Sequence, residues 1–212
     1  MGVYQDQVLP RLVDIVLSGP EFSRIRAEVA AGLEGEVVEV GFGSGRNVAH
    51  YPAAVTRVRA VDPALTGRRL AAPRVAASPV PVDYVGLDGA NLPVDDASVD
   101  HVLCTWTLCT IPDVEAALRE IRRILRPGGA LHFVEHGQAP VRRVAMCQDL
   151  LTPLQRRVAG GCHLNRPIRA LIEASGLQVE QLKNFFMPGP RALTYMYQGV
   201  AVRPGPGADR PE

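Results

Sequence analysis

The 212-residue sequence predicts an α/β fold in which helices cover both faces of a mostly parallel sheet. Two observations support this prediction. Short β-branched segments alternate with segments whose apolar residues recur every three or four positions, which is typical of strands joined by helices. The predicted strands are also rich in aliphatic residues along their whole length, as expected for a parallel sheet that is buried on both faces.

The elements follow in order along the chain. Apolar residues spaced by three and four predict two amphipathic helices within residues 4–33, separated near Ser18, Gly19 and Pro20. A helix is expected to begin within 44–50, and another covers 113–125 before the stop sequence RPGG. Strands are predicted over residues 36–41, 57–62, 80–86, 99–105 and 130–135.

The C-terminal part adds a helix over 166–175, closed by Gly176, and two strands over 177–186 and 193–202. Only a short turn joins these strands, so they must be antiparallel. We therefore expect one domain over 1–203. Within this domain, residues 1–35 are expected to form cap helices and 138–165 a lid insertion. Residues 204–212, which follow the domain, are expected to form a disordered tail.

Composition excludes several classes of protein. With 23 Lys and Arg against 22 Asp and Glu, the chain has no general attraction for nucleic acid or acidic lipid. No apolar run reaches about 18 residues, so no transmembrane helix is expected, and without a secretory leader the predicted location is the cytoplasm. The four cysteines lack the two close ligand pairs of a structural zinc site, so free thiols and no metal are expected.

A glycine-rich loop follows the first predicted strand. It reads Glu39-Val40-Gly41-Phe42-Gly43-Ser44-Gly45 and lies where an α/β sheet has its ligand crevice. Glycine allows close approach of a ligand to the backbone and permits positive φ. Asp62 ends the second strand, where a carboxylate can accept hydrogen bonds from both hydroxyls of a ribose. The pair predicts a cofactor that contains a nucleoside.

The glycine spacing indicates which nucleoside. A dinucleotide fingerprint, G-x-G-x-x-G, would place its last glycine at position 46, which is Arg46. An NAD-linked oxidoreductase is therefore the disfavoured alternative. Glu39, two residues before the first glycine, suits a cofactor with a positive amino or sulfonium group better than a pyrophosphate.

Four segments resemble the class I S-adenosylmethionine-dependent methyltransferases. They are VVEVGFGSG, AVDP, GLDGANLPVDDASVD and REIRRILRPGGALHFVEHG, in the order typical of the family, and they span residues 36–137. The resemblance implies S-adenosylmethionine (SAM) as the cofactor and transfer of its methyl group to a small molecule. It also implies a Rossmann-like three-layer sandwich whose seven-stranded sheet ends in an antiparallel strand.

The resemblance assigns parts of SAM to particular positions. Gly41 and Gly43 are expected beside the methionine portion, and Asp62 is expected to bind the ribose hydroxyls. Asp88 is expected to meet the adenine amino group. The remaining cofactor positions are Glu39, Phe42, Pro63 against the adenine, Gly89, and Cys104 and Thr105 beside the methionyl group.

Other segments resemble one branch of the family, the animal methyltransferase-like proteins that methylate alkyl thiols and their small bacterial relatives. These segments are CTWTLCTIPD, the pair Glu135-His136, and GCHLNR. They imply an apolar thiol acceptor. Two alternatives remain: a quinone-precursor or phenolic O- or C-methyltransferase, and a catalytically silent SAM-binding protein.

Candidate acceptor residues follow the fourth and fifth strands. His136 is expected at the crevice rim, as a general base or polar contact, or else as a capping or solvent-facing residue. A phenol, with a pKa near 10, needs such a base more than a thiol, with a pKa about 8.5. Trp106, Cys109 and His163 are candidate substrate contacts. Their alternative roles are core packing for Trp106 and Cys109 and a local turn contact for His163.

Overall fold

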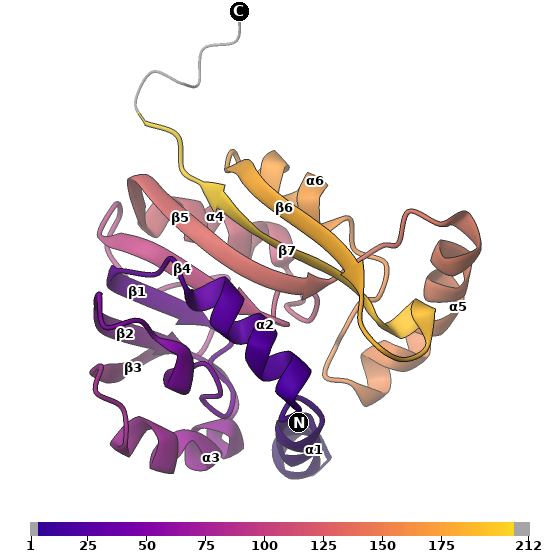
Figure 1. Cartoon of the computed structure of the whole chain (residues 1–212), viewed down its shortest axis with the longest axis horizontal. Coiled ribbons are helices and arrows are strands. Elements are labelled where there is room, and N and C mark those ends of the chain that lie inside the picture. The colour runs from indigo at the N-terminus through magenta and orange to yellow at the C-terminus, as the bar shows by residue number, and fades with distance from the viewer. Residues whose placement is uncertain (1–3, 206–212) are drawn as a thin grey trace, which may run out of the picture.

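The computed structural model describes residues 4–205 and has at its centre a seven-stranded sheet of order β3-β2-β1-β4-β5-β7-β6 (Figure 1). Only β7 runs against its neighbours, pairing antiparallel with β5 and with β6. The antiparallel last strand is therefore confirmed. The strands are β1 (Gly35–Val40), β2 (Val55–Val61), β3 (Val82–Gly86), β4 (Val99–Thr105), β5 (Leu125–His136), β6 (Gln178–Phe186) and β7 (Tyr195–Val202).

Six α-helices accompany the sheet in the described part of the chain. A π-helical turn, η1 (Tyr4–Val8), precedes the first helix, and the 3-10 turns are η2 (Val48–His50) and η3 (Arg191–Leu193). The two amphipathic N-terminal helices are present, separated at the predicted Ser-Gly-Pro sequence. The α-helices are α1 (Leu9–Val16), α2 (Pro20–Ala30), α3 (Leu65–Ala76), α4 (Val114–Ile124), α5 (Arg142–Val158) and α6 (Ile168–Ala174).

Two apolar cores lie on opposite faces of the sheet, as strand geometry requires of neighbouring residues. In β1, Val38 belongs to the cluster formed with Ile121 of α4 and Ile172 of α6. Its neighbour Val37 belongs to the cluster that includes Ile25 of α2. All five side chains are at most 1% exposed. Helices, sheet and helices therefore form the predicted three layers.

Three elements differ from the sequence predictions. The helix expected to begin within 44–50 is wrong: a turn and the short η2 occupy this segment, and Gly45 has φ of +72°. The prediction contained no helix where α3 lies, because Pro73 and a weak apolar pattern obscure it. Strand β5 starts at Leu125, and so includes the RPGG sequence expected to precede it.

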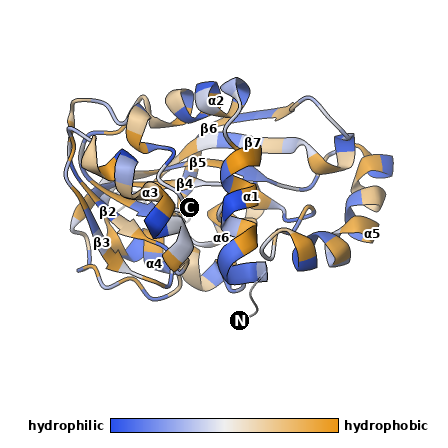
Figure 2. Ribbon diagram, turned by 90° about the horizontal axis from the view of Figure 1, so that it is seen from below, coloured by the Kyte–Doolittle hydropathy of each residue, from blue (hydrophilic) through white to orange (hydrophobic). Residues whose placement is uncertain are grey.

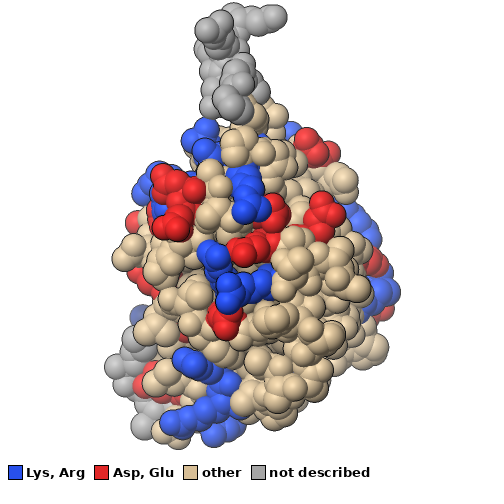
Figure 3. All heavy atoms as spheres, turned by 90° about the vertical axis from the view of Figure 1, so that its left-hand side faces the viewer, with Lys and Arg blue, Asp and Glu red and all other residues tan. Residues whose placement is uncertain are grey.

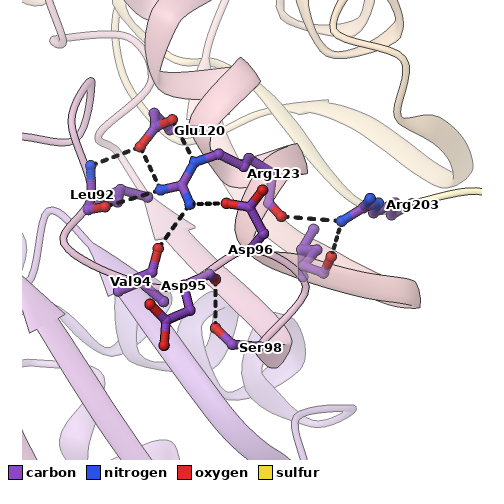
Figure 4. A network of polar contacts seen from close by, with 9 residues as sticks. Leu92, Val94, Asp95, Asp96, Ser98, Glu120, Arg123 and Arg203 are labelled. Carbon is purple, nitrogen blue, oxygen red and sulfur yellow. Dashed lines mark hydrogen bonds and ion pairs between the residues drawn. The ribbon is translucent and has the colours of Figure 1, made fainter.

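Arg123, on α4, holds the segment that leads into β4 (Figure 4). Arg203, at the chain's far end, donates a hydrogen bond to the backbone oxygen of Arg123 over 3.1 Å. The Arg123 guanidinium bonds to the backbone oxygens of Leu92 (3.0 Å) and Val94 (2.8 Å) and to the carboxylates of Asp96 (2.5 Å) and Glu120 (2.8 Å). Together these contacts hold residues 92–96, which precede β4, against α4.

The surface is mixed in charge and partly apolar. On the face shown in Figure 3, basic and acidic groups lie next to one another rather than forming a patch of one sign. Helices α1 and α5 contain hydrophobic residues, orange in Figure 2, of which Ile15 is 67% and Leu150 is 80% exposed. Within residues 4–205 no helix has the length and apolar character needed to span a membrane. The predicted tail is described only at residues 204–205, and 206–212 lie outside the described residues.

Candidate functional site

The glycine loop connects β1 to η2 and has three glycines with positive φ. Gly41 (φ +80°) lies directly against the loop after β4, because a Cβ added there would come within 2.0 Å of the Thr107 hydroxyl oxygen. Gly43 (φ +56°) faces open space, because its added Cβ would meet only the Gly41 carbonyl oxygen, at 3.9 Å. The loop therefore packs tightly on one side and leaves room for a ligand on the other.

Asp62, which directly follows β2, is tied to this loop. One carboxylate oxygen accepts a hydrogen bond from the Gly43 backbone N–H at 2.7 Å, and the other accepts from Ala64 at 2.7 Å. Burial raises the pKa of Asp62, and these two bonds partly offset that shift. Each oxygen keeps a further lone pair. The carboxylate lines a cavity of about 180 Å³, so it can still accept two ribose hydroxyl groups.

The predicted adenine contacts are sequence neighbours of this cavity's lining, which includes Asp62, Gly86 and Leu87. Asp88 is exposed, and its carboxylate accepts a hydrogen bond from Ala90 N–H at 2.9 Å. Pro63 is exposed beside Asp62, and Gly89 lies against Val40, where an added Cβ would come within 2.9 Å. Pro63 therefore directly follows one lining residue of the cavity, and Asp88 directly follows another.

Glu39, at the end of β1, is 1% exposed and bonded within the protein. Its oxygens accept hydrogen bonds from the Asn47 amide at 2.9 Å and the Tyr51 hydroxyl at 2.5 Å. Burial raises its pKa to about 7 despite these bonds. Asn47 also donates to the Thr105 hydroxyl at 3.0 Å, and its own buried amide oxygen has no hydrogen-bond partner among residues 4–205. Sequence patterns did not single out Asn47, whose position outside the glycines gives no distinctive signal.

Trp106 directly follows β4 and is buried against α2, in the apolar cluster that includes Ile25 and Val29. Its backbone has φ of +54°, and its ring contacts Phe22 edge to face, with centroids 5.3 Å apart. The Arg26 guanidinium lies 4.7 Å from the ring centroid. Burial lowers the pKa of Arg26 to about 10. The side chains of Cys104 and Phe42 likewise lie inside apolar clusters, each in a different one. Either residue would therefore reach a cofactor through its backbone.

Glu135, at the end of β5, organises the loop after β4. This fully buried carboxylate accepts three backbone N–H bonds, from Thr107 and Leu108 at 2.9 Å each and from Cys109 at 3.1 Å. Burial raises its pKa to about 7 although the three bonds act to lower it. Arg166 supports the same loop by donating to the backbone oxygens of Leu108 and, over 2.7 Å, of Ile111. Neither the contacts of Glu135 nor those of Arg166 could be predicted from the amino-acid sequence.

Cys109, His136 and Cys162 converge beside this loop, and their ligand-type atoms all lie within 4.8 Å of one another. The Cys162 sulfur lies 3.8 Å from the Cys109 sulfur and 3.8 Å from His136 Nδ1. The contact with Cys109 lowers the pKa of Cys162 and raises that of Cys109. Burial acts to lower the pKa of His136, but contact with Cys162 and the nearby Glu135 raise it above its ordinary value.

His163 lies at the edge of this group and makes a local contact. Its backbone N–H donates to the Cys109 carbonyl oxygen at 2.8 Å, and its ring Nδ1 lies 3.3 Å from the same oxygen. The ring is half-buried. All four cysteines lie in the described part of the chain and none is bridged. Cys147 is the exposed one.

The N-terminal segment links the glycine loop to the predicted lid. Asp14 of α1 accepts hydrogen bonds from the Ser44 hydroxyl at 2.5 Å and from Arg46 Nε at 2.7 Å. Burial acts to raise the pKa of Asp14, but its polar and basic contacts outweigh burial and lower it. At the other end, the Tyr4 hydroxyl donates to the Val158 carbonyl oxygen of α5 at 2.6 Å. The segment thus bridges both sides of the crevice.

These residues fit a bound SAM molecule. The open face of Gly43, the spare lone pairs of Asp62 and the free amide oxygen of Asn47 supply space and hydrogen-bond acceptors for an amino group and a ribose. The apolar walls near Trp106 would keep water from the reacting methyl group.

Known proteins resemble this chain in sequence and in fold. Residues 38–133 match the family described as a methyltransferase domain. The chain is 31% identical over 166 residues to thiol S-methyltransferase TMT1B of Rattus norvegicus, covering 76% of this chain and 68% of that protein. It is 30% identical over 192 residues to thiol S-methyltransferase TMT1A of Homo sapiens, covering 88% and 75%. The solved structure of geranyl diphosphate methyltransferase in complex with SAM matches 96% of this chain and 91% of that chain, with a TM-score of 0.68 and 11% identity.

Proposed function

We propose that this chain, which belongs to the SAM-dependent methyltransferase family, methylates the sulfur atom of a small apolar thiol. The observation that carries the choice of acceptor is the similarity to proteins named thiol S-methyltransferases, at 30 and 31% identity over 88 and 76% of this chain. The predicted acceptor end supports it, because two cysteines and a histidine gather there, and the nearby Glu135 carboxylate is already bonded to three backbone N–H groups.

SAM supplies, when bound, a methyl group on a sulfonium sulfur that is an excellent leaving group. What remains for the protein is to orient the two reactants, which can lower the barrier by about 7–11 kcal/mol. Asp62 and the backbone of Gly43 hold the ribose side. Glu135 holds the loop from Thr107 to Cys109 through three hydrogen bonds. Gly41 of the cofactor loop packs closely against Thr107 of that loop.

An apolar acceptor suits the exposed apolar side chains of α1 and α5. Leu150 and Met146 of α5 and Ile15 of α1 are all more than 60% exposed, so an apolar molecule approaching this side gains contacts that water does not offer. The thiolate is the attacking form of a thiol. His136, half-buried beside Cys162, is the group at this end that can help the acceptor lose its proton.

The test is a screen of the purified protein with methyl-labelled SAM and matched alkyl thiols, phenols and amines, followed by mass spectrometry of the products. We expect labelled thioethers. His136→Ala should reduce thiol turnover by about 100-fold or more while leaving SAM affinity unchanged. His50→Ala is the matched control, because His50 contacts Ser23 away from the acceptor end. Labelled phenolic products without thioethers would favour the quinone-type alternative, and no product from any class would favour the silent SAM-binding alternative.

A further inference from the structure

We propose that Cys109, His136 and Cys162 form a three-ligand zinc site whose fourth position takes the sulfur of the acceptor thiol. The three residues come from separate segments: the loop after β4, the end of β5 and the turn after α5. Their spacing in the sequence follows no metal motif, which is why the cysteine pattern predicted no metal. The role of the acceptor in this inference rests on the proposed function, whereas binding of the ion does not.

The distances match those of a tetrahedral zinc ion. A zinc–sulfur bond of about 2.3 Å places two tetrahedral sulfur ligands about 3.8 Å apart. The Cys109 and Cys162 sulfurs lie 3.8 Å apart, far beyond the length of a disulfide. A zinc–nitrogen bond of about 2.0 Å gives a sulfur–nitrogen separation of about 3.6 Å. The distance from Cys162 sulfur to His136 Nδ1 is 3.8 Å. The remaining separation, from the Cys109 sulfur to His136, is at most 4.8 Å, so an ion fits once this edge shortens by up to about 1 Å.

The surrounding contacts are those of a supported metal ligand set. Leu164, Ala159 and Leu193 pack around the two cysteine side chains and exclude water from them. The Cys109 backbone is held on both sides, by Glu135 at its N–H and by His163 at its carbonyl oxygen. Two thiolates and one imidazole form a soft donor set that selects zinc over magnesium or calcium.

Three protein ligands leave one coordination position free, as is typical of catalytic rather than structural zinc sites. The acceptor thiol would lose its proton to solvent as its sulfur binds the ion. That sulfur then forms a bond to the methyl carbon while the bond from this carbon to the sulfonium breaks, and its electron pair stays on the donor sulfur. The thioether product carries no negative charge and leaves the ion readily. His136 would then act by holding the ion rather than by taking the proton.

The first experiment measures the ion without turnover. Purified full-length protein, stripped with a chelator under reducing conditions, is titrated with Zn²⁺ and separately with Co²⁺. We expect one ion per chain, sulfur-to-cobalt charge-transfer absorption and the intense visible bands of tetrahedral cobalt. X-ray absorption of the zinc form should give two sulfur neighbours at about 2.3 Å, rising to three when an alkyl thiol is added. No stoichiometric binding, or a sulfur count other than two, would overturn the proposal.

Variants locate the ion. Cys162→Ser and Cys109→Ser should each weaken zinc binding by more than about 100-fold, since even outer contacts of such sites contribute 10 to 100-fold. Cys147→Ser is the matched control, because Cys147 is exposed and outside the cluster. Equal loss in the control would contradict the site. If a cluster variant does not fold, the sulfur count of the wild-type protein decides alone.

The two proposals can fail separately. Thiol methylation that persists in chelator-treated, zinc-free protein would refute the zinc site and leave the proposed function intact. Stoichiometric zinc, with a third sulfur neighbour absent in the presence of thiols and no thioether formed, would refute the acceptor role and the proposed function together while retaining the ion.

Discussion

Gly41→Ala should be far more costly than an ordinary replacement of a positive-φ glycine. Gly41 has φ of +80°, which costs a residue with a Cβ about 1–2 kcal/mol. The new methyl group would also lie 2.0 Å from the Thr107 hydroxyl oxygen and 2.7 Å from Thr107 Cβ, so the loop after β4 must move. Overpacking of this kind costs about 1–3 kcal/mol. The sum is about 2–5 kcal/mol.

Gly128→Ala is the matched control. Gly128 has φ of +83°, and an added Cβ would meet nothing within 4 Å, so it carries the backbone cost without the clash. We expect urea unfolding to give about 1–2 kcal/mol for Gly128→Ala and at least about 1 kcal/mol more for Gly41→Ala. Thr107→Gly in the Gly41→Ala background should recover the difference, because the clash includes the Thr107 Cβ. Equal losses for the two alanine variants would refute the close packing of the two loops.

Three further predictions concern the cofactor site, pH and the N-terminal segment. Asp62→Ala should weaken SAM binding by about tenfold or more in calorimetry, through loss of ribose hydrogen bonds, and unchanged affinity would contradict this role. Glu39 and Glu135 have pKa values raised to about 7 in the folded state, so the native protein holds protons that the unfolded chain releases above about pH 4.5. The free energy of unfolding should therefore fall as pH rises from about 4.5 to 7, by about 3 kcal/mol for each group. Glu39→Gln or Glu135→Gln should flatten this dependence of stability on pH. Stability that instead rises over this pH range would contradict the argument from burial. Asp14→Ala should speed amide hydrogen exchange in α1 but not in β4, because only α1 loses its bonds to Ser44 and Arg46; unchanged exchange in α1 would show that other contacts hold the helix.

Much of the fold was predictable because its signals are local. Strand β4 matches its prediction residue for residue, since Val99 to Thr105 is a compact run of strand-forming residues between turn signals. Helix α4 was equally clear, because its apolar residues repeat with helical spacing and Asp113 caps its start over 2.9 Å. Helix α3 was missed because its few apolar residues do not form a stripe, with Pro73 near its end.

The site was predictable only in part, for a different physical reason. Gly41 and Asp62 can be recognised from a sequence motif, because binding of the cofactor requires those residue types at that spacing. Asn47 and Arg166 do not, since their partners are distant in the sequence and become neighbours only after the sheet forms. The same holds for Cys109 and Cys162, which are 53 positions apart and meet across the loop that Glu135 holds.

The protein also contains an intrinsic fluorophore. Trp106 is the single tryptophan of the chain, and it lies between the end of β4 and α2, touching the Phe22 ring and the Arg26 guanidinium. Its indole N–H is buried and has no hydrogen-bond partner in the described part of the chain. The ring lies at the end of β4 and contacts two residues of α2. Binding of a ligand or opening of the N-terminal segment should therefore change the wavelength and the intensity of its fluorescence emission. Stopped-flow fluorescence of the unlabelled protein can therefore time those events directly.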